Sequence, residues 1–326
     1  MRITPANIKA LSLLGQKGSA FNYGLLEAAE EHPELCVLTA DLALLTGLDR
    51  FRRKFPDRFI QCGIAEQNMM GIAAGLAMEG AMPVATTYCS FIAVRALEQI
   101  RQNISSTRAN VKIVGTFAGV VAAKSGISHW ATEDIAFMRA LPGMTVLSPS
   151  DSLEAVKAFK AMCDMDGPVY LRLSGSVNCP AVSQEDFEFK VGALRRIRDG
   201  SGIAIIATGL MVKEALDAAV MLDGRGISAA VYDAATIKPI DRAALEAIFR
   251  EYPLVATAEE HTVIGGLGSA VAEARAGLRD APPVVMIGFD DCYTKPGSQR
   301  YIWDLAGLTA ERIAARLEMK AREYGI

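Results

Sequence analysis

Short apolar runs rich in β-branched residues alternate with longer amphipathic segments along the first half of the chain. The apolar runs predict strands at 34–42, 59–63, 82–88, 111–117, 144–150 and 168–174. The amphipathic spacing predicts helices at 91–104, 131–141 and 152–163. Strands that alternate with helices form parallel βαβ units, and several of these runs are apolar on both faces, as a sheet between two helical layers requires.

A polar stretch between residues 174 and 192 interrupts this pattern and is the predicted linker. Beyond it the alternation resumes, with predicted strands at 202–209, 227–234, 253–261 and 282–290. Helices are predicted at 212–222, at 241–249, after 268 and from 309 onward. We therefore predict an α/β protein with two domains, 1–190 and 191–326, each a mostly parallel sheet flanked by helices.

The composition excludes several classes of function. The 326 residues carry 34 Lys and Arg against 37 Asp and Glu, a formal net charge of −3, so nothing draws the chain to nucleic acid or to an anionic membrane. The six cysteines are scattered without a CxxC pair, which predicts free thiols rather than disulfides or a zinc site. The first residues lack a secretory signal pattern, and we expect a cytoplasmic protein.

One acid, Glu66, stands between the strand-like run 59–63 and a helix-like run of Ala, Gly and Met. The ordinary role of such an acid is to complement the dipole of the helix that begins there. Ligands of open parallel sheets, however, bind outside the carboxyl ends of the strands. A carboxyl at this point is therefore a candidate site residue.

Seven motifs in sequence order extend this indication. The segment GIAEQNMMGIAAGLA around Glu66, followed by PVATTYCSFIAVRALEQIR, resembles the pyrimidine-binding domain of transketolase-family enzymes, which use thiamine diphosphate. GISHWATEDIAFMRALPGMTVLSPSD is similar to that family's His-x-x-x-Glu helix and the strand and turn after it. IIATGLMVKEAL, IKPID and AEEHTVIGGLGSAVAEA resemble its C-terminal domain, so the resemblance covers residues 14 to 320.

The resemblance implies roles in cofactor binding for four residues of the first domain. Glu66 matches the carboxyl that hydrogen-bonds a ring nitrogen of the cofactor's aminopyrimidine and so promotes its activation. Phe91 matches the ring that stacks on the pyrimidine, and Tyr88 lines the same pocket. Asp41 matches an aspartate near the positively charged thiazolium ring. Outside such a site, the two aromatic residues would be core residues and Asp41 a cap or turn residue.

The side chains with which transketolases bind a sugar phosphate, here called the phosphate grip, are missing from this sequence. By resemblance, the Arg, Ser and His side chains that hold the phosphate in transketolases fall here on Ala20, Leu45, Phe117 and Gly175. None of these side chains makes the charge-assisted hydrogen bonds that a phosphate needs. The usual sugar phosphates are therefore not the expected substrates.

Candidate substrate contacts come from the segment that carries His129. By resemblance His129 faces the substrate, where an imidazole donates to a carbonyl oxygen or relays a proton. Of the other two histidines, His32 is expected in solvent and His261 at a domain interface. The candidates for binding an altered sugar, such as a carboxylate or sulfonate, are Lys124, Ser125, Ser128, Trp130 and Arg172, although the two cations would as readily be solvated surface residues.

The second half of the family's cofactor site has no counterpart in the sequence. Full-length transketolases hold Mg²⁺ and the diphosphate with a Gly-Asp-Gly motif and a downstream Asn, and neither occurs here at suitable spacing, so we assign no metal ligand to this chain. We predict a split enzyme in which a partner subunit carries that domain, with an α2β2 assembly. Its expected reaction transfers a two-carbon ketol unit from a ketose-type donor to an aldehyde acceptor.

Two other functions stay open at this level. The chain could be a subunit of a 2-oxo acid decarboxylating or acyloin-forming enzyme, similar to deoxyxylulose phosphate synthase or to the β subunit of a 2-oxo acid dehydrogenase. Alternatively, it could be a scaffold subunit that kept the fold and lost catalysis. Retention of Glu66, Phe91 and His129 argues against the scaffold, and loss of the phosphate grip argues for it.

Overall fold

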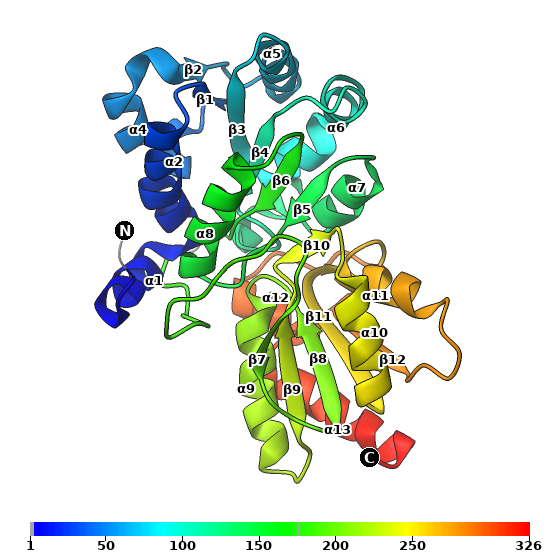
Figure 1. Ribbon diagram of the computed structural model, residues 1–326. Helices are drawn as coiled ribbons and strands as arrows, with labels where there is room; N and C mark the ends of the chain where they lie inside the picture. The colour runs from blue at the N-terminus through cyan, green and yellow to red at the C-terminus, as the bar shows by residue number, and fades with distance from the viewer. Residues whose placement is uncertain (1–2, 175–176) are drawn as a thin grey trace.

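The computed structural model describes residues 3–174 and 177–326, which form two α/β units (Figure 1). In the first unit, seven strands form one sheet in the order β10-β5-β6-β4-β3-β1-β2. All of its strand pairs are parallel except β10 with β5. The strands are β1 (Leu35–Thr39), β2 (Phe59–Gln61), β3 (Met82–Tyr88), β4 (Lys112–Thr116), β5 (Thr145–Leu147), β6 (Val169–Arg172) and β10 (Thr236–Lys238).

Helices cover both faces of this sheet, because neighbouring residues of its strands point to opposite sides. Val84 of β3 packs in one apolar cluster, whereas the next residue, Ala85, packs in another. The first cluster lies under α2 (Leu25–Glu31), α4 (Asp49–Lys54) and α8 (Ser152–Cys163), and α1 (Pro5–Ser19) packs on α8 through a separate, smaller cluster. The second lies under α5 (Glu66–Met78), α6 (Leu97–Gln99) with the π-helical turns on either side of it, and α7 (Asp134–Ala140). The two-sided burial confirms the prediction of a sheet between helical layers.

The second unit repeats the scheme with five strands in the order β12-β11-β8-β9-β7. Its strands are β7 (Arg195–Arg198), β8 (Ile203–Ala207), β9 (Ala229–Asp233), β11 (Leu254–Thr262) and β12 (Val284–Phe289), and only β7 is antiparallel to its neighbour. Its helices are α9 (Met211–Asp223), α10 (Arg242–Glu251), α11 (Leu267–Arg275), α12 (Gln299–Leu305) and α13 (Ala310–Tyr324). The predicted helices correspond to α9, α10, α11 and α13, whereas α12 was not predicted.

The two units are joined more closely than a linker requires. Residues 177–194 contain no helix or strand, and β7 begins directly after them. Farther along the chain, β10 leaves the second unit and pairs antiparallel with β5 at the edge of the first sheet, with Thr236 opposite Leu147 (Figure 1). This pairing covers an edge strand that would otherwise expose unpaired backbone groups. The sequence pattern did not predict it.

Among the helices of the described residues, none has the length and apolar content needed to cross a membrane.

Candidate active site

The carboxyl ends of β1, β3 and β4 lie next to one another in the first sheet, and the residues after them form the candidate site. Asp41 comes two residues after β1, and Phe91 opens a π-helical turn, Phe91–Arg95, three residues after β3. Phe117 follows β4 directly, and Glu66 is the first residue of α5, after the loop that leaves β2. The parallel sheet therefore gathers at one edge residues that are up to 76 positions apart in the sequence.

Glu66 is a buried carboxyl at the beginning of a helix. Its side chain is 8% exposed, and the helix dipole of α5 favours a negative charge at this point. Its charged partner is Arg95, whose Nη1 donates a hydrogen bond to Glu66 Oε1 at 3.1 Å. Arg95 is itself 46% exposed, so the ion pair is open to solvent on the arginine side.

Arg95 also stacks on Phe91. The guanidinium carbon lies 3.8 Å from the centroid of the Phe91 ring, a cation–π contact. One planar group thus touches an aromatic face and hydrogen-bonds a buried carboxylate at the same time. These are the two contacts that the resemblance assigns to the aminopyrimidine of thiamine diphosphate, which is also planar and also hydrogen-bonds through a ring nitrogen. The residues present therefore fit that half of the cofactor.

Sequence reasoning missed Arg95, although a signal was available. Arg95 follows Phe91 by four residues in a segment predicted to be helical, and side chains at that spacing lie on one face of a helix. A cation placed there can stack on the Phe91 ring, and in this structure it also hydrogen-bonds Glu66.

A row of aromatic rings continues from Phe91 along the sheet edge. Tyr88 stacks on Phe91 with ring centroids 5.2 Å apart, and the centroid of the Phe117 ring lies 4.4 Å from that of Tyr88. The His129 ring meets Phe91 edge-on at 5.3 Å. Ser128 Oγ lies 2.9 Å from His129 Nδ1, which fixes the ring orientation. Within the described residues no partner occupies His129 Nε2, so this nitrogen is available to a ligand.

Asp41 is held in an unusual backbone conformation at the same edge. Its φ of 58° lies in the left-handed region, which Asp tolerates better than most residues with a side chain. Its N–H donates to Gln61 Oε1 at 2.8 Å, which ties the end of β1 to the end of β2. Asp41 is exposed, so it places an anion at the rim of the candidate site.

Arg172 is not available to a substrate, and that expectation was wrong. Its side chain is 4% exposed, and its Nε donates to Asp134 Oδ2 at 2.8 Å. Its Nη2 donates to the backbone oxygens of Ala131 and Glu260, at 3.0 and 2.8 Å. These contacts neutralise its charge and occupy most of its hydrogen-bond donors. The guanidinium thereby joins α7 to β11 across the domain interface.

The other predicted substrate contacts differ in exposure. Lys124 and Ser125 are exposed in the turn just before His129, so both stay predictions. Trp130 is 4% exposed, packs against the core of the second domain and donates its Nε1–H to the Ala123 oxygen at 3.3 Å. Its indole N–H is thus already satisfied, and contact with a substrate through its ring stays a prediction.

The positions that match the phosphate-binding side chains of transketolases also differ in exposure. Ala20 is fully buried, whereas Leu45 is 53% exposed and Phe117 is partly exposed at the sheet edge. Gly175 lies outside the described residues. Arginine, serine and histidine are absent from the three described positions, so the structure has no phosphate grip of the usual kind there.

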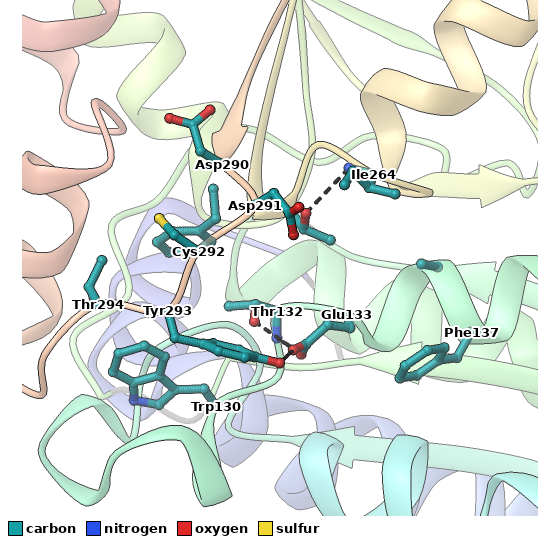
Figure 2. A pocket seen from close by; sticks show the side chains of 13 residues that line it. Trp130, Thr132, Glu133, Phe137, Ile264, Asp290, Asp291, Cys292, Tyr293 and Thr294 are labelled. Carbon is teal, nitrogen blue, oxygen red and sulfur yellow. Dashed lines mark hydrogen bonds between the residues drawn. The ribbon is translucent and has the colours of Figure 1, made fainter.

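A cavity of about 340 Å³ opens between the two domains beside Trp130 (Figure 2). The Tyr293 hydroxyl donates to Glu133 Oε1 across it at 2.6 Å. No Lys or Arg lines the cavity, and Trp130 is the only predicted site residue that reaches it. This cavity is therefore separate from the cluster of Glu66 and Phe91. Its lining residues are Trp130, Thr132, Glu133, Ala136, Phe137, Thr262, Ile264, Phe289, Asp290, Asp291, Cys292, Tyr293 and Thr294.

Comparison with known proteins identifies both domains. The family description "Transketolase, pyrimidine binding domain" matches residues 17–178, and "Transketolase, C-terminal domain" matches residues 192–313. A putative transketolase C-terminal section of Methanocaldococcus jannaschii is 40% identical over 309 residues, which are 93% of this chain and 97% of that protein. The 6-deoxy-6-sulfo-D-fructose transketolase subunit SqwH of Clostridium sp. is 40% identical over 291 residues, 89% of each protein.

A solved structure agrees with these relatives. The structure of a split-gene transketolase, described as an inactive β4 tetramer, superimposes with a TM-score of 0.84 at 40% identity, covering 94% of this chain and 97% of that one. Each of these proteins aligns with this chain over 89–97% of its own length. The chain therefore belongs to the transketolase family, in which it corresponds to the C-terminal subunit of the split members.

Proposed function

We propose that this chain binds the pyrimidine half of thiamine diphosphate in a two-component transketolase, and that the complex transfers a two-carbon ketol unit from a ketose-type donor to an aldehyde acceptor. The observation that supports this most is the shared contact of Arg95 with Glu66 and Phe91. Arg95 is a flat group that hydrogen-bonds the Glu66 carboxylate and stacks on the Phe91 ring, and the pyrimidine would need the same two kinds of contact.

Each residue of the sheet edge has a defined task in this proposal. When bound, thiamine diphosphate supplies the nucleophilic carbon that takes up the ketol unit. Glu66 would hold a proton against the pyrimidine ring nitrogen and Phe91 would stack on the ring, while Tyr88 stacks on Phe91. Asp41 offers a negative charge near the cationic half of the cofactor. Arg95 would compete with the cofactor for both residues, because it hydrogen-bonds the Glu66 carboxylate and stacks on the Phe91 ring.

His129 is placed to act on the substrate. Its Nδ1 is engaged by Ser128, its ring lies edge-on to Phe91, and Nε2 is directed to no protein partner among the described residues. An imidazole in this state donates to a developing oxyanion, or accepts a proton from a hydroxyl, near neutral pH.

The rest of the cofactor must be held by another chain. We propose a partner subunit that carries the diphosphate-binding domain and Mg²⁺, an α2β2 heterotetramer and a cytoplasmic location, where the six free cysteines would stay reduced. Large apolar side chains within three residues of Asp41, Glu66 and Phe91 are exposed: Leu44 is 76%, Ile64 78% and Val94 62% exposed. Such a patch beside an incomplete site favours a subunit contact. A split-gene relative described as an inactive β4 tetramer supports the need for a second subunit.

The donor and acceptor are not the usual sugar phosphates in this proposal. The described positions of the phosphate grip are Ala20, Leu45 and Phe117, which offer no charged side chain. A relative of 40% identity is a subunit of a transketolase named for 6-deoxy-6-sulfo-D-fructose, in which a sulfonate replaces the phosphate.

The decisive experiment assembles the chain with its diphosphate-domain partner and measures ketol transfer with thiamine diphosphate and Mg²⁺. Glu66→Gln should lower kcat by about 10²- to 10⁴-fold, the usual range for loss of a general acid–base group. The matched control is Glu98→Gln, an exposed acid paired with Arg101 outside the site, which should keep wild-type turnover. Wild-type activity in Glu66→Gln would overturn the assignment, and CO₂ release from pyruvate would point instead to a decarboxylating enzyme.

A further inference from the structure

One lysine reaches the sheet edge from outside the strand ends. Lys17 lies in the last turn of α1, and its Nζ donates to the backbone oxygen of Leu45 at 2.6 Å. The same Nζ stands 4.8 Å from the centroid of the Phe117 ring. Both contacts fall on positions where transketolases carry phosphate-binding side chains. A cation therefore stands among the positions of the missing grip, although it comes from a different element.

This ammonium is poorly compensated. Within the described residues, no carboxylate oxygen lies within 4 Å of Lys17 Nζ, whereas Lys157 and Lys160, which are similarly half-buried, each pair with an acid. Lys112 is fully buried and donates to two backbone oxygens. An ammonium has three donors, and Lys17 uses one of them on a carbonyl.

Burial makes the missing counter-ion more costly. It lowers the pKa of Lys17, because the charged form has lost part of its water without gaining an anion. A bound anion would restore the charge balance, and the partly exposed side chain leaves a path for one. The alternative is a purely structural role, in which the hydrogen bond from Lys17 to Leu45 is a structural strap that holds α3 (Ala43–Thr46) against α1.

The aromatic row connects Lys17 to the proposed reaction centre. Phe117 contacts both Lys17 and Tyr88, and Tyr88 stacks on Phe91, which contacts His129. A substrate whose carbonyl lies at His129 could thus run along the row and end at Lys17. One lysine neutralises one charge, which suits a monoanion better than a phosphate dianion.

We propose that Lys17 binds the terminal anionic group of the sugar substrate and selects a singly charged oxyanion, a sulfonate or carboxylate, over a phosphate. This inference rests on the proposed function, because it takes the aromatic row as the substrate path. Lys17 is a specificity residue here and takes no part in the bond changes.

The test compares acceptors that differ only at the terminal group in the assembled two-subunit enzyme: glyceraldehyde and its 3-sulfonate, 3-carboxylate and 3-phosphate analogues. Lys17→Gln should lower kcat/KM for the sulfonate by about 10- to 100-fold and change glyceraldehyde by no more than about twofold. Lys17→Arg should keep most of the preference. Lys9→Gln, an exposed lysine of the same helix, is the matched control and should behave as wild type. The KM for the sulfonate should also rise at alkaline pH, because Lys17 loses its proton there.

Two results would overturn the proposal. An equal loss for charged and neutral acceptors in Lys17→Gln would show a structural strap, and an unchanged ratio would show that another group binds the anion. If the wild-type complex turns over none of the acceptors, the proposed function fails separately. The chain alone then decides the anion site by NMR of ¹³C-dimethylated lysines, where methanesulfonate should shift the resonance that Lys17→Arg removes. An unmoved resonance would rule the site out.

Discussion

Two regions of this chain concentrate charged side chains, and they treat them differently. At the domain interface, Arg172, Asp134 and His261 are 4% exposed or less and meet several partners each. At the sheet edge, Glu66 and Lys17 make one hydrogen bond each, with a partner residue that solvent can reach. Completely satisfied charges hold the fold together, whereas loosely partnered ones are ready to exchange their partner for a ligand.

The interface shows how completely a polar cluster can be satisfied. Glu259 accepts hydrogen bonds from the N–H groups of Leu267 and Gly268, both at 2.7 Å, at the beginning of α11. His261 donates from Nδ1 to the Thr262 oxygen at 2.7 Å, and its Nε2 accepts the Ala136 N–H at 3.3 Å. This pattern requires a neutral ring. It also confirms that His261 serves the domain interface.

The largest effect should come from breaking the interface. Asp134→Asn leaves the Arg172 guanidinium buried without its counter-ion, and we expect a loss of about 3–5 kcal/mol in the free energy of unfolding. Urea denaturation of the chain measures this. Asp304→Asn, which removes an exposed partner of Arg312, should leave the free energy of unfolding unchanged within the error of the measurement, because solvent screens this pair. If Asp134→Asn instead kept wild-type stability and lost only turnover, Arg172 would belong to the active site.

A second effect concerns the pH dependence of stability. Burial lowers the pKa of His261 to about 4, so this group costs stability as pH falls from 6.5. Burial raises the pKa of Glu259 to about 7, so this group adds stability as pH falls from 7 to 4.5. The two slopes have opposite sign and similar size, about 1.4 kcal/mol per pH unit at most, and largely cancel between pH 4.5 and 6.5.

Single variants should expose these hidden slopes. Relative to wild type, His261→Gln should gain stability between pH 6.5 and 4.5, because only Glu259 then contributes. Glu259→Gln should lose stability over the same range, because only His261 then contributes. Urea titrations at three pH values measure both, and the other carboxyls cancel in the comparison. Slopes equal to wild type in both variants would contradict the assigned protonation states.

The smallest effect should come from the sheet edge. Arg95→Ala removes the group that competes for Glu66 and Phe91, so thiamine diphosphate should bind the assembled enzyme more tightly. The gain should be at most about fivefold, because a half-exposed ion pair contributes less than about 1 kcal/mol. Isothermal titration in the presence of Mg²⁺ measures it, and Arg101→Ala provides the control. Weaker binding would mean that Arg95 is itself a cofactor ligand.

Much of the fold could be predicted because burial on both faces of a strand is visible in the sequence. The run 82–88 is apolar or β-branched throughout, and all seven residues of β3 are buried. Helix α8 was predicted with the bounds that the structure has, because Asp151 caps it through the Glu154 N–H at 2.8 Å. The crossing of β10 was not predictable, since a three-residue strand carries too short a pattern and its partner is remote in sequence.

The candidate site divides in the same way. Glu66, Phe91 and His129 could be placed because each lies in a motif, and the structure brings them to one edge. Their chemical roles stay predictions. Arg172 misled the sequence interpretation, because a cation at a strand end looks the same whether it faces a ligand or a buried acid. Arg95 was missed although its spacing from Phe91 is visible in the sequence, whereas Lys17 could not be found because its contacts depend on how α1 lies relative to Leu45 and Phe117.

The pairing of β10 with the sheet of the first unit affects how the chain can be divided into fragments. A gene fragment that stops near the linker would encode the candidate site but would lack the strand that covers the edge of β5. The missing strand begins at Thr236, more than forty residues beyond the last irregular residue at 194. Separating the two halves would therefore expose the unpaired edge of β5. Exchanging one half between relatives would require that the linker and the β10–β5 pairing both remain compatible.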